Sequence, residues 1–184
     1  MAGEELVLDT TYLLPIFGIG VGLEGFNELF PKLLSEHAVL YNPVSLVEAK
    51  WIVLKLAKRK PQKRDTLLER FRIGLEALLR DERLGQTELT NPDIEGVADL
   101  LLTRAGVADY FDRLIYATAT SRGSVLLTED EELARVAQRG DLPAPKRVIR
   151  WDDVVRKRPR HNRGAEDERT KDVQHPPLHH EGRS

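Results

Sequence analysis

Four carboxylates stand where a fold of alternating strands and helices would bring side chains together. Asp9 and Asp130 each come shortly after an apolar run, and Glu48 and Asp112 lie in the first turns of expected helices. Oxygen-only ligands of high negative charge suit hard cations such as Mg²⁺ or Mn²⁺. Four carboxylates forced together would otherwise repel one another and take up protons. A metal ion held in this way can activate a water molecule and neutralise phosphate charge, which is the chemistry of phosphodiester hydrolysis.

The three helix acids also have an ordinary structural explanation. Residues 45–48 read as a capping box, and residues 128–131 read as a second one that contains Asp130. Asp109 and Asp112 fit an N-cap followed by an acid at the third helical position, which the helix dipole favours. Asp9 has less to cap, because apolar residues follow it. Taken singly, the helix acids favour capping, and Asp9 favours function.

The elements that must position these acids can be read from the apolar pattern. Short apolar runs predict strands at 5–8, 38–41, 87–90, 124–127 and 147–151. Helical spacing predicts helices at 12–17, 26–34, 45–58, 65–84, from Asn91 onward, 109–121 and 130–138. Short apolar strands separated by helices predict an α/β domain of three layers, α/β/α, with a short and mainly parallel central sheet. Ligands bind at the carboxyl ends of such strands, so the four acids are expected to meet there.

Composition excludes several other chemistries. The chain has 184 residues, a formal net charge of −2 and no cysteine, which removes disulfides, thiolate catalysis and zinc–cysteine sites. Four of the five histidines lie in the last 24 residues, so the body keeps only His37. No apolar stretch approaches the ~20 residues of a membrane span, and no basic region precedes the first apolar run. We therefore expect a cytoplasmic protein that does not contact a membrane.

The chain changes character near its end. Residues 156–184 hold eight lysines and arginines, five acids and scarcely any apolar side chains. We expect one folded domain at 1–155 and a disordered, charged tail at 156–184. The basic residues at 156–160 could add salt-dependent affinity for nucleic acid, or they could only keep the tail soluble. The histidines at 175–180 are assigned no function.

Four sequence fragments, in this order, resemble the PIN domain, the nuclease fold of VapC-type toxins and related ribonucleases. They read LDTTYLL, PVSLVE, YFDRLIYATA and VLLTED, and a closing RVIRW completes a resemblance over residues 5–151. The resemblance implies that Asp9, Glu48, Asp112 and Asp130 are the catalytic and metal-binding acids. Supporting positions are implied for three further residues, namely Thr11 beside the first acid, Thr128 before the last and Glu132 as a secondary acid. Asp109 competes weakly with Asp112 for the third place.

The same resemblance implies a function. It points to a Mg²⁺- or Mn²⁺-dependent endoribonuclease that cleaves single-stranded or structured RNA and leaves a 5′-phosphate. PIN domains commonly pair as homodimers, and the toxins among them also bind a small antitoxin protein. One alternative is a free-standing RNA-processing nuclease of the same fold. Another is a non-catalytic module that binds protein or RNA, although retention of all four carboxylates argues against it.

Several lysines and arginines are candidates for contacting RNA. Arg113 follows Asp112 directly, and with Arg122 it is expected near the active face. Lys55 and Lys58 begin a basic cluster that continues to Arg64. Its position near the end of a helix could equally be explained by the favourable interaction of cations with the helix dipole. Among the aromatic residues, Trp51 and Phe71 lie in apolar helix patterns, so we interpret both as core.

Residues 20–25 read GVGLEG and match the dinucleotide fingerprint G-x-G-x-x-G. That fingerprint requires the first glycine to close a tight turn directly after a strand. Here residues 10–17 intervene, and no acid at the end of the second strand is placed for a ribose. We therefore expect no dinucleotide and interpret the glycines as a connector between two short helices.

Overall fold

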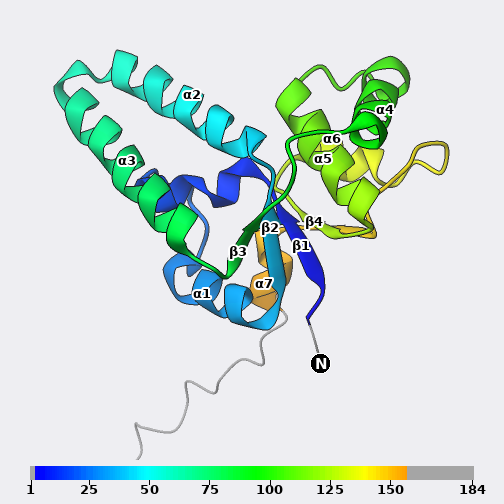
Figure 1. Ribbon diagram of the computed structural model, residues 1–184, viewed down its shortest axis with the longest axis horizontal. Helices are drawn as coiled ribbons and strands as arrows, with labels where there is room; N and C mark the ends of the chain where they lie inside the picture. Colours follow the sequence, from blue (N-terminus) through cyan, green and yellow to red (C-terminus); the bar gives the residue numbers. More distant parts are fainter. Residues whose placement is uncertain (1–2, 157–184) are drawn as a thin grey trace, which may run out of the picture.

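The structure, a computed structural model, describes residues 3–156 (Figure 1). Its centre is one sheet of five parallel strands in the order β3-β2-β1-β4-β5. All carboxyl ends therefore lie along one edge of the sheet. The strands are β1 (Glu5–Leu8), β2 (Ala38–Tyr41), β3 (Leu84–Gln86), β4 (Val125–Leu127) and β5 (Arg147–Ile149).

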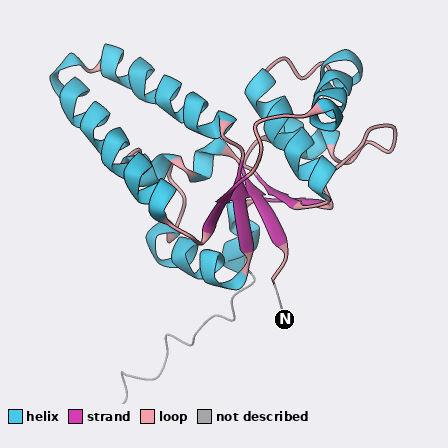
Figure 2. Cartoon of the chain, in the orientation of Figure 1, coloured by secondary structure: helices cyan, strands magenta, loops and turns pink. Residues whose placement is uncertain are grey.

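Successive side chains of the central strands enter two separate cores. Leu6 and Leu8 of β1 belong to one buried cluster, whereas Val7 between them belongs to the other. Leu126 of β4 likewise faces the cluster of Val7. Because alternate residues of a strand point to opposite faces, helices must cover both sides of this sheet. The predicted three-layer α/β/α architecture is confirmed (Figure 2).

Two groups of helices flank the sheet. α2 and α3 pack as an antiparallel hairpin that projects from the sheet, and α4 and α5 pack together on the other side (Figure 1). The first group contains α1 (Phe26–Glu36), α2 (Val44–Arg59), α3 (Arg64–Arg80), α7 (Trp151–Arg156) and three 3₁₀ turns, η1 (Thr10–Tyr12), η2 (Leu14–Phe17) and η3 (Pro61–Lys63). The second contains α4 (Pro92–Leu100), the π-helical turn η4 (Leu101–Ala105), α5 (Tyr110–Arg122) and α6 (Glu131–Val136).

Two strand predictions differ from the structure. The third strand lies at 84–86, so the strand predicted at 87–90 is wrong. Carbonyls of Glu88 and Leu89 instead accept hydrogen bonds from the Asn42 side chain, at 3.3 and 2.9 Å. The last strand ends at Ile149, because Trp151 begins α7 and is buried in the first core. No periodic pattern had indicated that short helix.

The described residues end at Arg156, the last residue of α7. The expected tail, with its basic residues after 156 and its histidines at 175–180, lies outside the described residues. Over the range 3–156, no helix combines the length and apolarity that crossing a membrane requires.

A close contact at Gly74 joins the helical hairpin to the rest of the fold. A Cβ added at Gly74 of α3 would lie 2.3 Å from the carbonyl oxygen of Ile16 in η2. That distance is far inside van der Waals contact, and the obstacle is backbone. Gly74 is therefore needed for α3 to approach η2, which follows Asp9 and the turn η1 in the chain.

Gly74→Ala is expected to destabilise the protein by about 1–3 kcal/mol, as overpacking does. Gly96→Ala is the matched control, because Gly96 lies inside α4 with open space around its Cα. Alanine there is expected to stabilise by about 0.5–1 kcal/mol through helix propensity. Urea denaturation measures both. Equal effects of the two substitutions would contradict the close packing at Gly74.

Candidate active site

Asp9 is held at the centre of the carboxyl edge. Its backbone N–H donates to the carbonyl of Leu127 at 3.0 Å, which continues the β1–β4 pairing one residue beyond the strands. The hydroxyl of Thr128 donates to Asp9 Oδ2 at 2.6 Å. Burial raises the pKa of Asp9, and the Thr128 hydrogen bond opposes that rise. Asp9 is thus a buried carboxylate whose orientation is set by the neighbouring strand.

Glu48 lies in the second turn of α2, because the helix begins earlier than the sequence suggested. Val44 is its first residue, and the Val44 N–H donates to Asn42 Oδ1 at 2.8 Å. The predicted capping box at 45–48 is therefore wrong, and Ser45 is buried inside the helix. Relieved of a capping role, Glu48 accepts a hydrogen bond from the Thr10 hydroxyl at 2.5 Å.

Asn42 is a positioning residue that sequence reasoning treated only as a strand stop. Its fully buried side chain accepts from the N–H of Val44, the first residue of α2, and also donates to Thr118 Oγ1 of α5 at 2.8 Å. It therefore fixes the start of the helix that carries Glu48 against the helix that carries Asp112. Residues next to Asn42 in the sequence gave no sign of this hydrogen bond, because its acceptor lies 76 positions away.

Asp112 is the third residue of α5, as predicted. Asp109 is the N-cap and accepts from the Phe111 N–H at 2.8 Å, so the cap is occupied by Asp109 and not by Asp112. Burial raises the pKa of Asp112 to about 7, and the charges of four nearby acids add to the rise. Those acids are Asp9, Asp109, Glu48 and Asp130. Since the charges of the other three predicted acids all affect the pKa of Asp112, the four acids lie near one another.

Asp130 is itself the N-cap of α6. Its Oδ1 accepts from the Leu133 N–H at 2.9 Å, and its own N–H donates to Thr128 Oγ1 at 3.0 Å. The expectation that Asp130 merely lies inside a capping box is therefore wrong. Capping engages Oδ1 and leaves Oδ2 as the oxygen that could serve as a ligand. Thr128 touches two of the four acids.

Glu129 is a further residue that the sequence did not single out. Its Oε1 accepts from the Tyr12 hydroxyl at 2.5 Å and from the Trp151 N–H at 2.8 Å. Burial, together with this hydrogen bond, raises the pKa of the Tyr12 phenol, so Tyr12 remains a donor. Glu129 thus ties the turn after β1 to the start of α7, directly behind Asp9.

The two remaining acid-supporting predictions have different outcomes. Thr10, and not Thr11, donates its hydroxyl to a site acid, namely Glu48. Thr11 contributes through its backbone N–H, which lowers the pKa of Asp9. Glu132 is exposed in the first turn of α6. The family resemblance had favoured Thr11, and the 3₁₀ turn that begins at Thr10 was not foreseen.

The acids fit a hard divalent cation by their chemistry, although they do not form a finished cage. Among residues 3–156, no group of three or more histidine or acidic side chains is arranged to hold a metal ion. Burial and like charge raise the pKa of Glu48 as well as those of Asp9 and Asp112. A divalent ion would relieve that repulsion, and oxygen donors are the ligands that Mg²⁺ and Mn²⁺ prefer.

Both candidate arginines are engaged elsewhere. Arg113 is buried, its Nη1 donates to the carbonyl of Ala98 at 3.3 Å, and it lies over the Tyr110 ring. Arg122 pairs with Glu5 at 2.8 Å, at the amino end of β1. That is the opposite end of the strand from Asp9, so the expectation that Arg122 lies near the active face is wrong. Neither guanidinium is placed to contact RNA at the acids.

The candidate lysines are exposed on α2. Lys55 is close enough to Glu48 to lower its pKa, and its ammonium lies 5.6 Å from the centre of the Trp51 ring. Lys58 follows one turn later. Phe71 is buried, as predicted, but Trp51 is 56% exposed, so its interpretation as core is wrong. The apolar pattern of α2 did not reveal that the Trp51 side chain is exposed to solvent.

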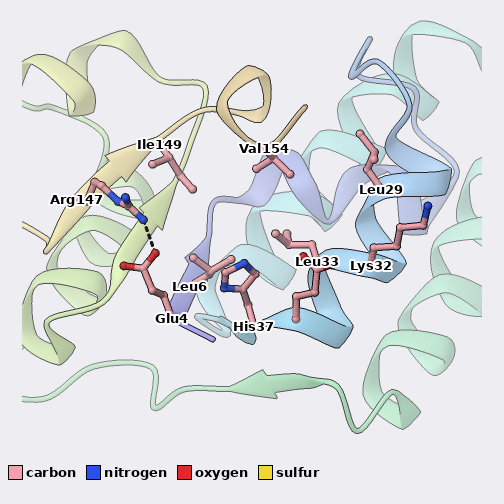
Figure 3. Close-up of a pocket in the computed structure, with 10 residues that line it drawn as sticks. Glu4, Leu6, Leu29, Lys32, Leu33, His37, Arg147, Ile149 and Val154 are labelled. Carbon is pink, nitrogen blue, oxygen red and sulfur yellow. Dashed lines mark hydrogen bonds and ion pairs between the residues drawn. The ribbon is translucent and has the colours of Figure 1, made fainter. Parts of the chain in front are cut away.

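Two hollows lie away from the acids. One, of about 350 Å³, lies at the amino end of the sheet among Leu6, Leu33, Ile149 and Val154, with the Glu4–Arg147 ion pair at one side (Figure 3). The other, also of about 350 Å³, is lined by the stretch 20–25. That stretch follows the 3₁₀ turn η2, and Gly25 ends it in a left-handed conformation before α1. The strand-to-glycine turn of a dinucleotide site is therefore lacking here.

An acidic cluster at the carboxyl edge of a short parallel sheet, between two groups of helices, is the arrangement of a PIN-type nuclease domain. The model of the PIN domain matches residues 6–139, so the chain belongs to the PIN-domain family, whose members are generally nucleases. VapBC2 from Rickettsia felis, bound to a DNA fragment from its promoter, is similar with a TM-score of 0.54 and 16% identity. That match covers 80% of this chain and 99% of the other.

PAE2754 from Pyrobaculum aerophilum is similar with a TM-score of 0.54 and 21% identity, over 85% of this chain and 97% of the other. At such identities these likenesses support the fold. Comparison with curated proteins gave no significant match.

Thr128→Val is expected to lower nuclease activity about 10- to 100-fold, as loss of a group that orients a ligand does. The change removes the donor to Asp9 and leaves the Asp130 N–H without its acceptor. Since the hydroxyl lowers the pKa of Asp9, the pH profile should also move to higher pH. Thr128→Ser keeps the hydroxyl and should restore both. Full activity in Thr128→Val with an unmoved profile would contradict this role.

Proposed function

We propose that this protein is a metal-dependent endoribonuclease that uses Asp9, Glu48, Asp112 and Asp130 as metal ligands. What supports the proposal is that the charges of Asp9, Glu48 and Asp130, from the end of β1, α2 and the β4–α6 turn, all act on Asp112 of α5 at the carboxyl edge of the sheet. Mg²⁺ or Mn²⁺ bound there would supply an activated water and offset charge on the scissile phosphate. A family of nucleases supplies the reaction class.

The protein's own residues divide this work. The Thr128 hydroxyl donates to Asp9 and accepts from the backbone N–H of Asp130, so one hydroxyl sets the relation between two acids. Glu48 is oriented by Thr10, from the 3₁₀ turn that follows β1. Burial and like charge raise the pKa of Asp112 to about 7, so a bound cation would help to keep it ionised at neutral pH. Asp9 is buried, whereas Glu48, Asp112 and Asp130 are partly exposed.

Toxin activity within a toxin–antitoxin pair is the biological role that we favour. One of the similar structures is described as a VapBC2 complex on promoter DNA, which is a property of that protein. The partners that we propose for this chain are an RNA substrate, a second copy in a homodimer and a small antitoxin protein. A free-standing RNA-processing nuclease would share the site but need no antitoxin. A non-catalytic binding module would need neither the metal nor the acids.

The test of the proposal is cleavage of 5′-labelled single-stranded RNA by the full chain, with Mg²⁺, with Mn²⁺ and with EDTA. We expect cleavage with either ion, none with EDTA and product fragments that begin with a 5′-phosphate. Single-stranded DNA of the same sequence is the substrate control. If no divalent ion supports cleavage of any RNA offered, the proposal is wrong and the binding-module alternative stands.

Growth separates the toxin from the processing enzyme. Induced expression should arrest growth, and co-expression of the gene directly upstream should restore it if that gene encodes the antitoxin. Expression of the Asp9→Asn variant is the control for toxicity that does not arise from cleavage. Normal growth during expression of an active nuclease would support the processing role.

A further inference from the structure

Trp51 stands out on the helix that carries Glu48. Its indole is 56% exposed, although a large aromatic ring is normally at least partly withdrawn from water. The other tryptophan, Trp151, is 2% exposed and belongs to the core. Trp51 is three residues beyond Glu48, so it lies about one helical turn away on nearly the same side of α2.

A row of functional groups runs along this side of α2. Glu48, Trp51, Lys55 and Lys58 are spaced by three, four and three residues, which keeps them within about 80° around the helix axis. The row is about 15 Å long at 1.5 Å per residue. Its first member contacts the acidic site, and the Lys55 ammonium lies over the Trp51 ring at 5.6 Å. The row thus begins at the acids and continues as aromatic and then basic surface.

The charge along the row is uncompensated. α2 carries four lysines or arginines and Glu48 as its one acid. Among the described residues, neither Lys55 nor Lys58 forms an ion pair with a carboxylate, whereas many surface arginines do. Two further lysines, Lys60 and Lys63, follow in the turn to α3. A polyanion is the ligand that this charge fits.

We propose that the row from Trp51 to Lys58 binds single-stranded RNA, with one unpaired base stacked on the Trp51 indole and phosphates near Lys55 and Lys58. An exposed aromatic ring flanked by lysines is the combination with which proteins hold single strands, because stacking accepts any base and the lysines follow the backbone. The site would hold the RNA on one side of the acids and present the adjoining phosphodiester to them. The inference rests on the proposed function for its choice of ligand.

Val47 and Leu54 are also exposed on α2, at 58% and 45%, and an apolar ridge of this kind could contact a protein. The lysine row favours RNA, because a mainly apolar protein contact has no need of unpaired cations beside an indole. A protein interface is therefore a distinct outcome of the test.

The experiment measures binding of fluorescein-labelled single-stranded RNA to the full chain in EDTA, where no cleavage is expected. Trp51→Ala should weaken binding about 5- to 100-fold, the range of one stacked base, and Trp51→Phe should retain most of the affinity. Leu54→Ala is the matched control for loss of exposed apolar surface. Lys55→Gln should lower the salt dependence of binding by about one counterion, and Lys32→Gln on α1 should not.

Tryptophan emission gives a direct second reading. Because Trp151 is buried, RNA should quench the Trp51 component in the wild type and in Leu54→Ala, and the quench should vanish in Trp51→Phe. Equal RNA affinity of Trp51→Ala and wild type, or unquenched emission on saturation, would overturn the proposal. So would a Trp51→Ala variant that binds RNA normally but changes from dimer to monomer in size-exclusion chromatography. RNA binding without any metal-dependent cleavage would instead refute the proposed nuclease and leave this site standing.

Discussion

Asp112→Asn is expected to reduce RNA cleavage about 10²- to 10⁴-fold while leaving the fold intact. The substitution keeps the shape of the side chain but removes one negative ligand from the metal site. Metal stabilisation of the reacting charges is worth several kcal/mol, and each 1.4 kcal/mol is a factor of ten in rate. Asp9→Asn should be equally severe, because Asp9 lies at the centre of the acidic group.

Asp99→Asn provides the matched control. Asp99 is an exposed acid in α4, on the outer side of the second helical group, and its loss changes net charge by the same amount. Its cleavage rate should equal that of the wild type. The measurement is the single-turnover rate on labelled RNA with saturating Mn²⁺. Wild-type rates in Asp9→Asn and Asp112→Asn would remove the catalytic assignment, whatever the fold.

Through Asp112, a rise in pH should lower the free energy of unfolding in the absence of metal, and a bound divalent ion should raise it. In EDTA, folded Asp112 keeps its proton up to a pKa of about 7, whereas an unfolded aspartate loses it near its ordinary pKa of 3.8. A raised pKa means that stability is fully present below pH ~4 and falls as the pH rises toward 7. Relative to Asp112→Asn, the wild type should therefore lose free energy of unfolding between pH ~4 and ~7. Above pH ~7 the difference should be constant.

Mn²⁺ or Mg²⁺ should reverse this difference. The ion competes with the proton for the same oxygens, so it should stabilise the wild type more at pH 8 than at pH 6. At 100 times its dissociation constant, the gain is about 2.7 kcal/mol. Asp112→Asn should gain much less. Urea denaturation of the two proteins, with and without metal, measures both effects. Parallel stability curves from pH 4 to 8, or no stabilisation by either ion, would contradict a shared metal site.

The α/β/α fold follows from patterns that are local in the chain. A four-residue apolar run is long enough to specify a buried strand, and helical spacing over residues 45–58 and 109–121 specifies the helices on either side. Asp9 was recognisable because it ends such a run. Asp109 and Asp112 were recognisable because an N-cap and an acid three residues later satisfy the first turn of a helix by themselves. Such signals involve neighbours within about four positions.

The short parallel strand at 84–86 could not be read in the same way. It contains Gly85, whose missing Cβ leaves room for the Leu40 side chain of β2 at 2.4 Å from the place a Cβ would occupy. The residues after it have better strand propensity, but their carbonyls bond to Asn42. Packing against β2 therefore decided the strand's position, and propensity did not.

By itself, the sequence determined the three layers and the parallel edge, because an apolar period acts between near neighbours, and its resemblance to the PIN domain supplied the four candidate acids. Only the tertiary structure decided which side chains orient the acids, since the Thr10–Glu48 and Thr128–Asp9 hydrogen bonds join residues 38 and 119 positions apart. It also withdrew Arg113 and Arg122 from the site and turned Trp51 outward. The solvent-facing side of a helix depends on what packs against it, and no local pattern contains that partner.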